Sequence, residues 1–215
     1  DFDGLVERTR TRPIPSGAIS PRQALLFLVA ELVVGLVILL QFNRFAILVG
    51  AAALLLVFPY PYMKRITYWP QAWLGLTFNW GALLGCAAVL GGLSWPALVM
   101  YASGLFWTLG YDTIYAHQDK EDDALIGVKS TALRLGAHTK PWLLLFFALA
   151  VSLLGLSGWL TDLAWPFYAL LAAAWLQSIW QVSDLEMDDS TDCLTKFKSN
   201  RVFGFLVLAG IVAGK

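Results

Sequence analysis

Seven long apolar stretches alternate with short polar segments along the chain. The stretches cover residues 24–40, 45–60, 69–90, 95–111, 141–160, 164–182 and 201–214. A helix needs roughly 20 apolar residues to cross a bilayer, so several stretches must extend into their flanks. A helix satisfies its backbone hydrogen bonds internally, as hydrocarbon requires, and the stretches lack the strict alternation of barrel strands. We therefore predict an all-α, polytopic transmembrane helical bundle with seven spans.

The composition agrees with this pattern. Hydrophobic residues make up 58% of the chain and charged residues 14%, whereas soluble domains are roughly 45–50% apolar and about 25% charged. The formal net charge is zero, so we expect the lipid bilayer, and no nucleic acid, as a partner. Nothing in the sequence indicates an obligate protein partner.

The charged residues gather on one side of the predicted membrane. Four loops share that side, formed by residues 1–23, 61–68, 112–140 and 183–200. Together with the boundary residue Arg201, they carry every Lys and Arg except Arg44 and Lys215. The positive-inside rule makes this side the cytoplasmic face of a bacterial inner membrane, or the matrix face of a mitochondrial inner membrane. The same side carries every Asp and Glu except Glu31 and Asp162, which that rule does not require.

Glu31 lies inside the first apolar stretch. A carboxylate within a membrane span is a functional candidate by default. The simpler interpretation is a side chain that bonds to a neighbouring helix or reaches the lipid headgroups.

The most informative polar stretch covers residues 111–123. If the preceding helix continues through it, Asp112, Asp119 and Asp123 fall within about 40° of one another at about 100° per residue. Like charges four residues apart repel unless a cation lies between them. Mg²⁺ suits such a place, because it binds one or two carboxylates plus waters and substrate phosphates. The alternative is a solvated acidic loop, which would not need the flanking Tyr111 and Tyr115.

Two basic segments on the same side could hold phosphate groups. Arg8, Arg10 and Arg12 alternate along the first segment, and Lys64 and Arg65 lie in the loop that follows the second apolar stretch. Guanidinium groups are planar donors that match phosphate oxygens. Each segment alone is equally explained by anchoring to lipid headgroups. Combined with the acidic stretch and a surrounding membrane, the segments predict a site for an isoprenyl diphosphate.

These motifs resemble those of the UbiA superfamily of intramembrane prenyltransferases, and most closely its 4-hydroxybenzoate branch. The resemblance covers essentially all of the chain, and its strongest parts are residues 112–123, 126–132, 8–17, 60–65 and 68–71. The family's second aspartate motif falls on Asp119 and Asp123, and its upstream aspartate on Asp112. In the first motif, which has one asparagine and two aspartates, only the final aspartate is present, as Asp3. Since the family has nine spans, we expect a single prenyltransferase domain over residues 1–215, truncated at its N-terminus and inactive alone.

The resemblance implies an enzyme that transfers a polyprenyl group from polyprenyl diphosphate to the ring of 4-hydroxybenzoate, in ubiquinone biosynthesis. It implies Mg²⁺ as the cofactor, with Asp3, Asp119 and Asp123 as its ligands. Asp112 joins these three as a catalytic residue. The implied diphosphate-binding residues are Arg8, Arg12, Lys64 and Arg65.

Other functions stay open. The acceptor could be a different compound, such as homogentisate, a naphthoate, haem or a chlorophyll precursor. A CDP-alcohol phosphotransferase would require Asp-Gly-x-x-Ala-Arg, and Asp3-Gly4 is not followed by that pattern. A non-catalytic transporter or scaffold is a third possibility, although transporters place polar groups at mid-membrane between broken helices.

Overall fold

The structure, a computed structural model, describes residues 9–215, and this part of the chain is helical without strands. Its helices, in chain order, are α1 (Pro21–Leu39), α2 (Arg44–Ala52), α3 (Leu54–Val57), η3 (Tyr60–Tyr62), α4 (Met63–Ile66), α5 (Pro70–Phe78), α6 (Gly81–Leu90), α7 (Trp95–Ala116), η4 (His117–Asp119), α8 (Lys120–Ile126), α9 (Thr131–Leu135), η5 (Gly136–His138), α10 (Thr139–Trp159), α11 (Trp165–Ser183) and α12 (Ser190–Ala213). The all-α fold class is confirmed.

Each predicted apolar stretch forms a long helical segment, but two of these segments are broken. Residues 44–66 form α2, α3, η3 and α4 in succession. Pro59 and Pro61 flank the start of η3 and lack the N–H groups that a continuous α-helix would use. The break between α5 and α6 falls at Asn79, whose Nδ2 donates to the Gly75 carbonyl at 2.9 Å and to Thr108 Oγ1 at 2.8 Å. The hydrogen bond from Asn79 to Thr108 therefore connects the second break to α7.

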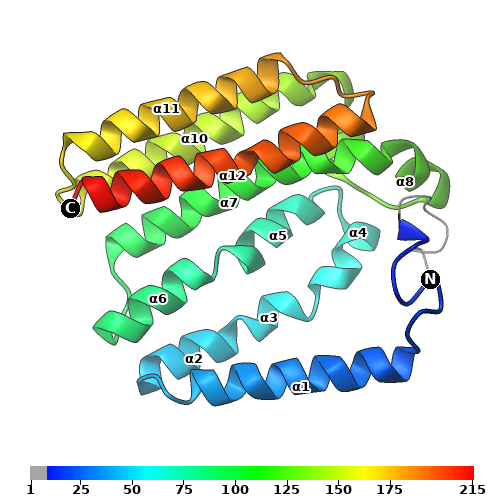
Figure 1. Ribbon diagram of the computed structural model, residues 1–215, viewed down its shortest axis with the longest axis horizontal. Helices are drawn as coiled ribbons and strands as arrows, with labels where there is room; N and C mark the ends of the chain where they lie inside the picture. The colour runs from blue at the N-terminus through cyan, green and yellow to red at the C-terminus, as the bar shows by residue number, and fades with distance from the viewer. Residues whose placement is uncertain (1–8) are drawn as a thin grey trace.

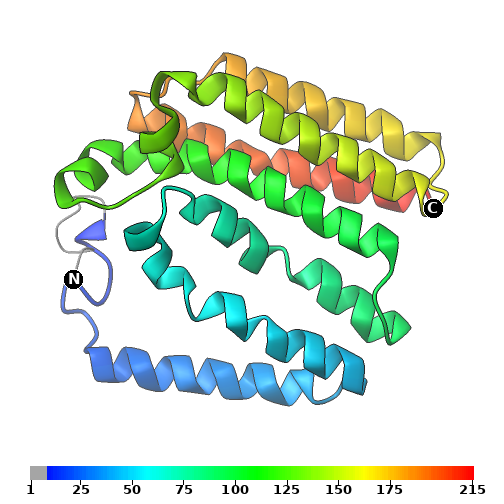
Figure 2. The ribbon, with the colours of Figure 1, turned by 180° about the vertical axis from the view of Figure 1, so that it is seen from behind.

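Four helical segments of the described chain are long and apolar enough to cross a membrane. They are Pro21–Leu39, Arg44–Ile66, Pro70–Leu90 and Thr131–Trp159. The helices α7, α11 and α12, with 22, 19 and 24 residues, have the required length but more polar sequences. Figures 1 and 2 show all of these long segments lying side by side. The membrane-embedded helical bundle is thus established, and the count of seven spans stays a prediction.

The charged loops lie together at one end of the bundle, as the alternation of loops predicts. Figure 1 places the described N-terminal segment, α4, α8 and the connection from α11 to α12 at its right-hand end. The C-terminus and the turns from α1 to α2 and from α6 to α7 lie at the opposite end. The predicted basic and acidic segments of the described chain are therefore neighbours in space.

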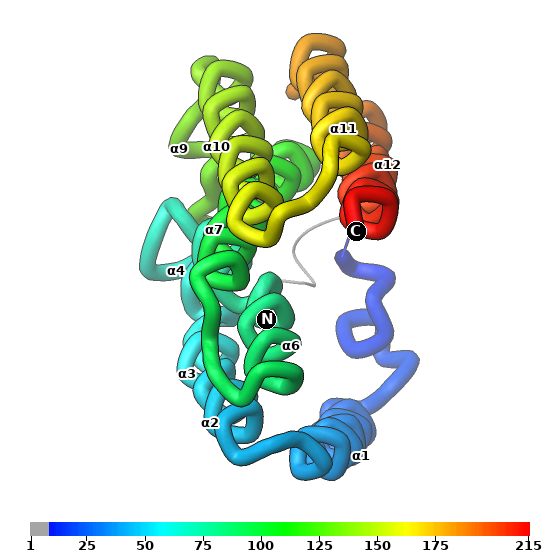
Figure 3. The backbone as a smooth tube through the Cα atoms, turned by 90° about the vertical axis from the view of Figure 1, so that its left-hand side faces the viewer, coloured from blue at the N-terminus to red at the C-terminus, as the bar shows by residue number. Residues whose placement is uncertain are grey.

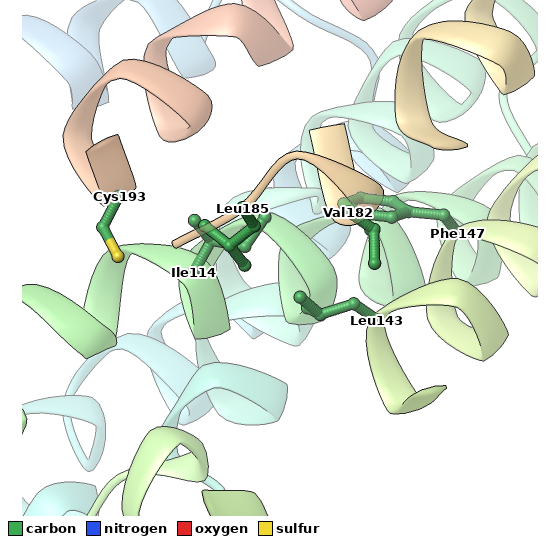
Figure 4. Close-up of a cluster of buried hydrophobic side chains, with 6 residues drawn as sticks. All are labelled: Ile114, Leu143, Phe147, Val182, Leu185 and Cys193. Atoms are coloured by element: carbon green, nitrogen blue, oxygen red, sulfur yellow. The ribbon is translucent and has the colours of Figure 1, made fainter. Parts of the chain in front are cut away.

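The core lies where α7 and α11 each pack against α10 and α12. Figure 4 shows one of its buried clusters, which consists of Ile114, Leu143, Phe147, Val182, Leu185 and Cys193. Seen end-on in Figure 3, the chain follows an arc from α1 through α2, α3 and α7 to α11 and α12. No residue of α1 is buried. Glu31 is likewise exposed, so the alternative in which it bonds to a neighbouring helix finds no support among residues 9–215.

Candidate active site

A polar cavity of about 430 Å³ opens at the charged end of the bundle. Segments far apart in sequence contribute to it: the N-terminal segment, η3 with α4, the start of α5, the end of α7, η4 and α8. Its lining residues are Arg12, Tyr60, Pro61, Lys64, Gln71, Asp112, Tyr115, Ala116, Asp119 and Asp123. Five of the eight residues that the sequence predicts for the site thus share one cavity.

The three predicted carboxylates line this cavity from three successive helices, α7, η4 and α8. The helix does not continue from Asp112 to Asp123, because η4 separates α7 from α8 and Asp119 has φ −113° and ψ 11°. The expectation of one continuous helix is therefore wrong. The convergence is nevertheless confirmed, since a short 3₁₀ turn keeps the chain running in a helical sense.

The end of α8 brings the chain back towards the cavity. Gly127 has φ +73°, a left-handed conformation that glycine adopts without a steric penalty. The N–H of Val128 then donates to the Asp123 carbonyl at 2.9 Å. Asp123 itself is only 4% exposed and lines the cavity, so its side chain is largely shielded from bulk solvent.

The basic side of the cavity comes from two segments. Lys64 lies in α4, whose first residue Met63 is buried and anchors this short helix. Arg12 lies in a compact turn, in which its N–H donates to the Thr9 carbonyl at 3.0 Å and its carbonyl accepts from Ser16 at 2.9 Å. The cavity therefore joins fixed cationic groups to carboxylates, an arrangement that can hold a metal–diphosphate complex.

The other three predicted residues of the site are Asp3, Arg8 and Arg65. Arg65 is exposed and is not part of the cavity lining. Asp3 and Arg8 lie outside the described residues, so their predicted roles stay predictions.

The carboxylates of the cavity fit Mg²⁺ that is bound together with a substrate phosphate. Within residues 9–215, no three His, Cys, Asp or Glu side chains lie close enough together to hold a metal ion. Asp119 and Asp123 nevertheless face one polar cavity, and Mg²⁺ commonly binds one or two carboxylates while waters and substrate phosphates complete its shell. The two carboxylates are therefore suited to a metal that arrives with its diphosphate.

Three other acids at this end, Asp184, Asp188 and Asp192, form ion pairs. Lys120 pairs with Asp188. The buried Lys196 Nζ bonds to Asp184 Oδ2 and Asp192 Oδ1, each at 2.8 Å. This acidic stretch holds the connection from α11 to α12 in place and lies outside the cavity lining.

His117 has a structural place beside the cavity. Its Nε2 lies 3.1 Å from Thr139 Oγ1, and the residue is 5% exposed. Burial lowers the pKa of the His117 imidazole to about 4, so the ring is neutral at pH 7. The bond to Thr139 joins η4 to α10.

The two tyrosines of the acidic stretch have separate surroundings. Tyr115 lines the cavity and packs against Phe197 with ring centroids 4.6 Å apart. Tyr111 is not part of the cavity lining, and its ring packs against Trp107 at 5.2 Å and Phe197 at 5.7 Å. Of these two tyrosines, Tyr115 is the one placed to face a substrate in this cavity.

Sequence reasoning gave no role to two lining residues, Tyr60 and Gln71. Both lie in segments that carry the resemblance, and each is a polar side chain at the end of an apolar stretch. That position could have marked both residues as candidates for the site, but the sequence does not indicate which way either side chain points. Gln71 is 3% exposed and is therefore a fixed part of the cavity wall.

A second, apolar cavity of about 400 Å³ lies farther along the bundle. Side chains of α7 and α12 line it, among them Met100, Trp107, Phe203 and Val207. Trp107 and Tyr115 lie eight positions apart on α7, or roughly 12 Å along its axis. An apolar space is thus available within the bundle at a short distance from the polar cavity.

Comparison with known proteins gives a consistent result. The profile of the family described as "UbiA prenyltransferase family" matches residues 1–208. The chain is 53% identical over 217 residues to the Arabidopsis thaliana protein "4-hydroxybenzoate polyprenyltransferase, mitochondrial", covering 100% of this chain and 53% of that protein. It is 53% identical to the Caenorhabditis elegans protein of the same name, covering 99% of this chain and 60% of that protein. The chain thus spans a little over half the length of these curated relatives.

A solved structure shares the fold. The apo structure of a UbiA homolog from Aeropyrum pernix K1 superposes with a TM-score of 0.83 at 26% sequence identity, covering 99% of this chain and 79% of that one. The arrangement of helices around the polar cavity is therefore a known architecture.

Proposed function

Since this chain belongs to the UbiA prenyltransferase family, we propose that it transfers a polyprenyl group from a polyprenyl diphosphate to the ring of 4-hydroxybenzoate. This acceptor is supported by the relatives named 4-hydroxybenzoate polyprenyltransferase, which are 53% identical to this chain over the aligned residues. That name also supports a place in ubiquinone biosynthesis.

One observation carries the proposal. Asp119 and Asp123 share a polar cavity with Lys64 and Arg12 at the end of an apolar helical bundle. A polyprenyl diphosphate has three requirements. It needs carboxylates that bind a divalent ion, cations that bind the diphosphate, and a surrounding membrane for its long apolar tail. A transporter would instead place its polar groups at mid-membrane.

The chain's own residues would support cleavage of the donor. Mg²⁺, when bound through Asp119, Asp123 and the predicted ligand Asp3, would neutralise negative charge that develops on the leaving diphosphate. Lys64, Arg12 and the predicted Arg8 add fixed positive charge at the same place. Breaking the bond between the allylic carbon and the diphosphate oxygen leaves a carbocation and releases diphosphate.

The second half of the reaction is an electrophilic aromatic substitution. The ring carbon ortho to the hydroxyl attacks the cation, a carbon–carbon bond forms, and a base removes the ring proton. We assign Asp112 the role of orienting the phenol hydroxyl, because it lines the cavity beside the two metal-binding candidates. The ring face of Tyr115 is suited to stabilising the cation.

The apolar cavity beside Trp107 gives the prenyl tail a place within the bundle. Its lining is almost entirely apolar, so burial of isoprenoid carbons there is favourable by about 25 cal/mol per Å² removed from water. Enclosure of the reacting atoms also keeps water from quenching the cation.

We further propose a mitochondrial or bacterial inner membrane as the location, with the cavity on the matrix or cytoplasmic face. The relatives' names include a mitochondrial location. The gathering of Lys and Arg at the cavity end supports the orientation through the positive-inside rule.

Product analysis tests the proposed function. The complete gene product that carries this chain is purified in detergent and offered mixed prenyl diphosphates, several aromatic acids and Mg²⁺. Mass spectrometry should find prenylated 4-hydroxybenzoate as the main product. If a different acceptor is prenylated, the reaction class holds but 4-hydroxybenzoate is the wrong acceptor. If none of the acceptors is prenylated, the proposed activity is refuted.

A further inference from the structure

Gln71 occupies an unusual position for an amide side chain. It lies in the first turn of α5, directly after Pro70 at the start of the helix. The residue is 3% exposed and lines the polar cavity together with Lys64, Asp112 and Asp119. A buried amide whose polar end faces a charged cavity is a candidate contact for a ligand.

The orientation of this amide is fixed by its partner. Gln71 Oε1 accepts a hydrogen bond of 3.0 Å from the backbone N–H of Thr131. A backbone N–H can only donate, so the atom facing Thr131 must be the oxygen and the Nε2 group must point away from it. Among residues 9–215 the structure gives Nε2 no hydrogen-bond acceptor, and because Gln71 lines the polar cavity, this donor is open to a partner there.

The contact with Thr131 is itself held rigidly. Thr131 and Thr113 are both fully buried, and their Oγ1 atoms lie 2.7 Å apart. Thr113 Oγ1 also donates to the Leu109 carbonyl at 2.6 Å. The carbonyl end of Gln71 is therefore locked to α7 and α9, and its amide nitrogen cannot turn towards Thr131.

We propose that Gln71 Nε2 donates a hydrogen bond to a substrate oxyanion in the polar cavity. The proposal rests on the proposed function, which supplies two sources of such oxygens: the diphosphate of the prenyl donor and the carboxylate of the aromatic acid. Lys64 and Arg12 line the same cavity and can bind the same anionic partner. Gln71 is thus a substrate-binding residue that determines affinity for one of the two substrates.

The substitution Gln71→Glu tests the amide nitrogen of the side chain while keeping its oxygen. Glutamate keeps an oxygen for the Thr131 N–H but replaces both amide donors with a negatively charged acceptor. Its matched control is Gln23→Glu, which adds the same charge at the same end of the bundle. Gln23 is exposed in the capping box of α1, a position where glutamate serves equally well.

The measurement is steady-state prenylation by the complete gene product in detergent, varying one substrate at a time. Gln71→Glu should raise the KM for one substrate by about tenfold to a hundredfold, the usual value of a hydrogen bond to a charged group. Gln23→Glu should leave both KM values within about twofold. A raised KM for the prenyl diphosphate identifies the diphosphate as the partner, and a raised KM for 4-hydroxybenzoate identifies the carboxylate.

Two further arms keep the test decisive. Should Gln71→Glu fail to fold, Gln71→Met, which has similar length and no charge, must raise the same KM. Should the wild-type protein show no transfer at all, the proposed function has failed on its own. Calorimetric titration with Mg²⁺-pyrophosphate and with 4-hydroxybenzoate then tests Gln71 separately. Unchanged affinity for both substrates in a folded Gln71 variant would overturn the proposal.

Discussion

The backbone N–H of Lys129 donates to the carbonyl of Lys64 at 2.8 Å. This bond ties the short basic helix α4 to the segment that follows the acidic helix α8. It is reinforced by the Lys129 side chain, whose Nζ donates to the Ile66 carbonyl at 3.2 Å and lies 5.5 Å from the Tyr68 ring centroid. The two halves of the cavity are therefore held together through the main chain, independently of any ligand.

Lys64 is expected to bind the diphosphate more directly than its neighbour. The variant Lys64→Met should raise the KM for the prenyl diphosphate by about tenfold or more, since it removes a charged donor from the cavity. Arg65→Met should have a clearly smaller effect, because Arg65 is not part of the lining. Equal effects of the two variants would indicate a general effect of surface charge. The measurement is initial rate against donor concentration in detergent.

Asp112 is expected to act in the chemical step. The variant Asp112→Asn keeps the size of the side chain but removes its charge, and should lower kcat by about a hundredfold, because the phenol loses the carboxylate that orients it. The KM for the prenyl diphosphate should change little, because we assign Asp112 to the phenol. A large rise in that KM with an unchanged kcat would instead place Asp112 at the diphosphate.

Much of the site could be predicted from the sequence. Helical spacing grouped Asp112, Asp119 and Asp123, and the family resemblance singled out Lys64 and Arg12 within basic segments that alone had two explanations. Helical spacing suggested that the three aspartates converge, but the 3₁₀ turn at η4 was not visible, since it depends on contacts of His117 with α10.

Other parts of the site could not be read from the sequence, for physical reasons. The resemblance gave Arg65 a place beside Lys64, and that role stays a prediction; Arg65 lies outside the cavity lining because neighbouring helical residues point about 100° apart. Gln71 was missed because its orientation depends on Thr131, which is distant in sequence and meets it only in the folded bundle.

Close packing of α7 against α10 should be sensitive to one glycine. A Cβ atom added at Gly110 would lie 2.7 Å from Phe147 Cε1, and Phe147 is fully buried and cannot move aside. Gly110→Ala should therefore destabilise the fold by about 1–3 kcal/mol. Gly85→Ala is the matched control, because a Cβ there meets nothing within 4 Å. Thermal melting in detergent should show a lower midpoint for the first variant alone.

The ion pairs of Lys196 should stabilise the protein without serving the reaction. Its Nζ bonds to Asp184 and Asp192 and lies 5.0 Å from the Trp180 ring centroid. Lys196→Met should cost about 1–3 kcal/mol of stability, whereas the exposed Lys198→Met should stay within about 0.5 kcal/mol of wild type. Both variants should keep the wild-type KM values when assayed well below their melting temperatures. A changed substrate affinity in Lys196→Met would contradict this assignment.

The central claim is that Asp119 and Asp123 hold Mg²⁺ together with the prenyl diphosphate. Its most direct test is the Mg²⁺-dependent formation of prenylated 4-hydroxybenzoate, quantified by mass spectrometry, in Asp119→Ala and Asp123→Ala variants of the complete gene product. The exposed Glu121→Gln variant on α8 serves as the control. We predict that each aspartate variant loses activity by at least about a hundredfold while remaining folded, and that the control keeps it. Near-normal turnover by either aspartate variant would contradict the account.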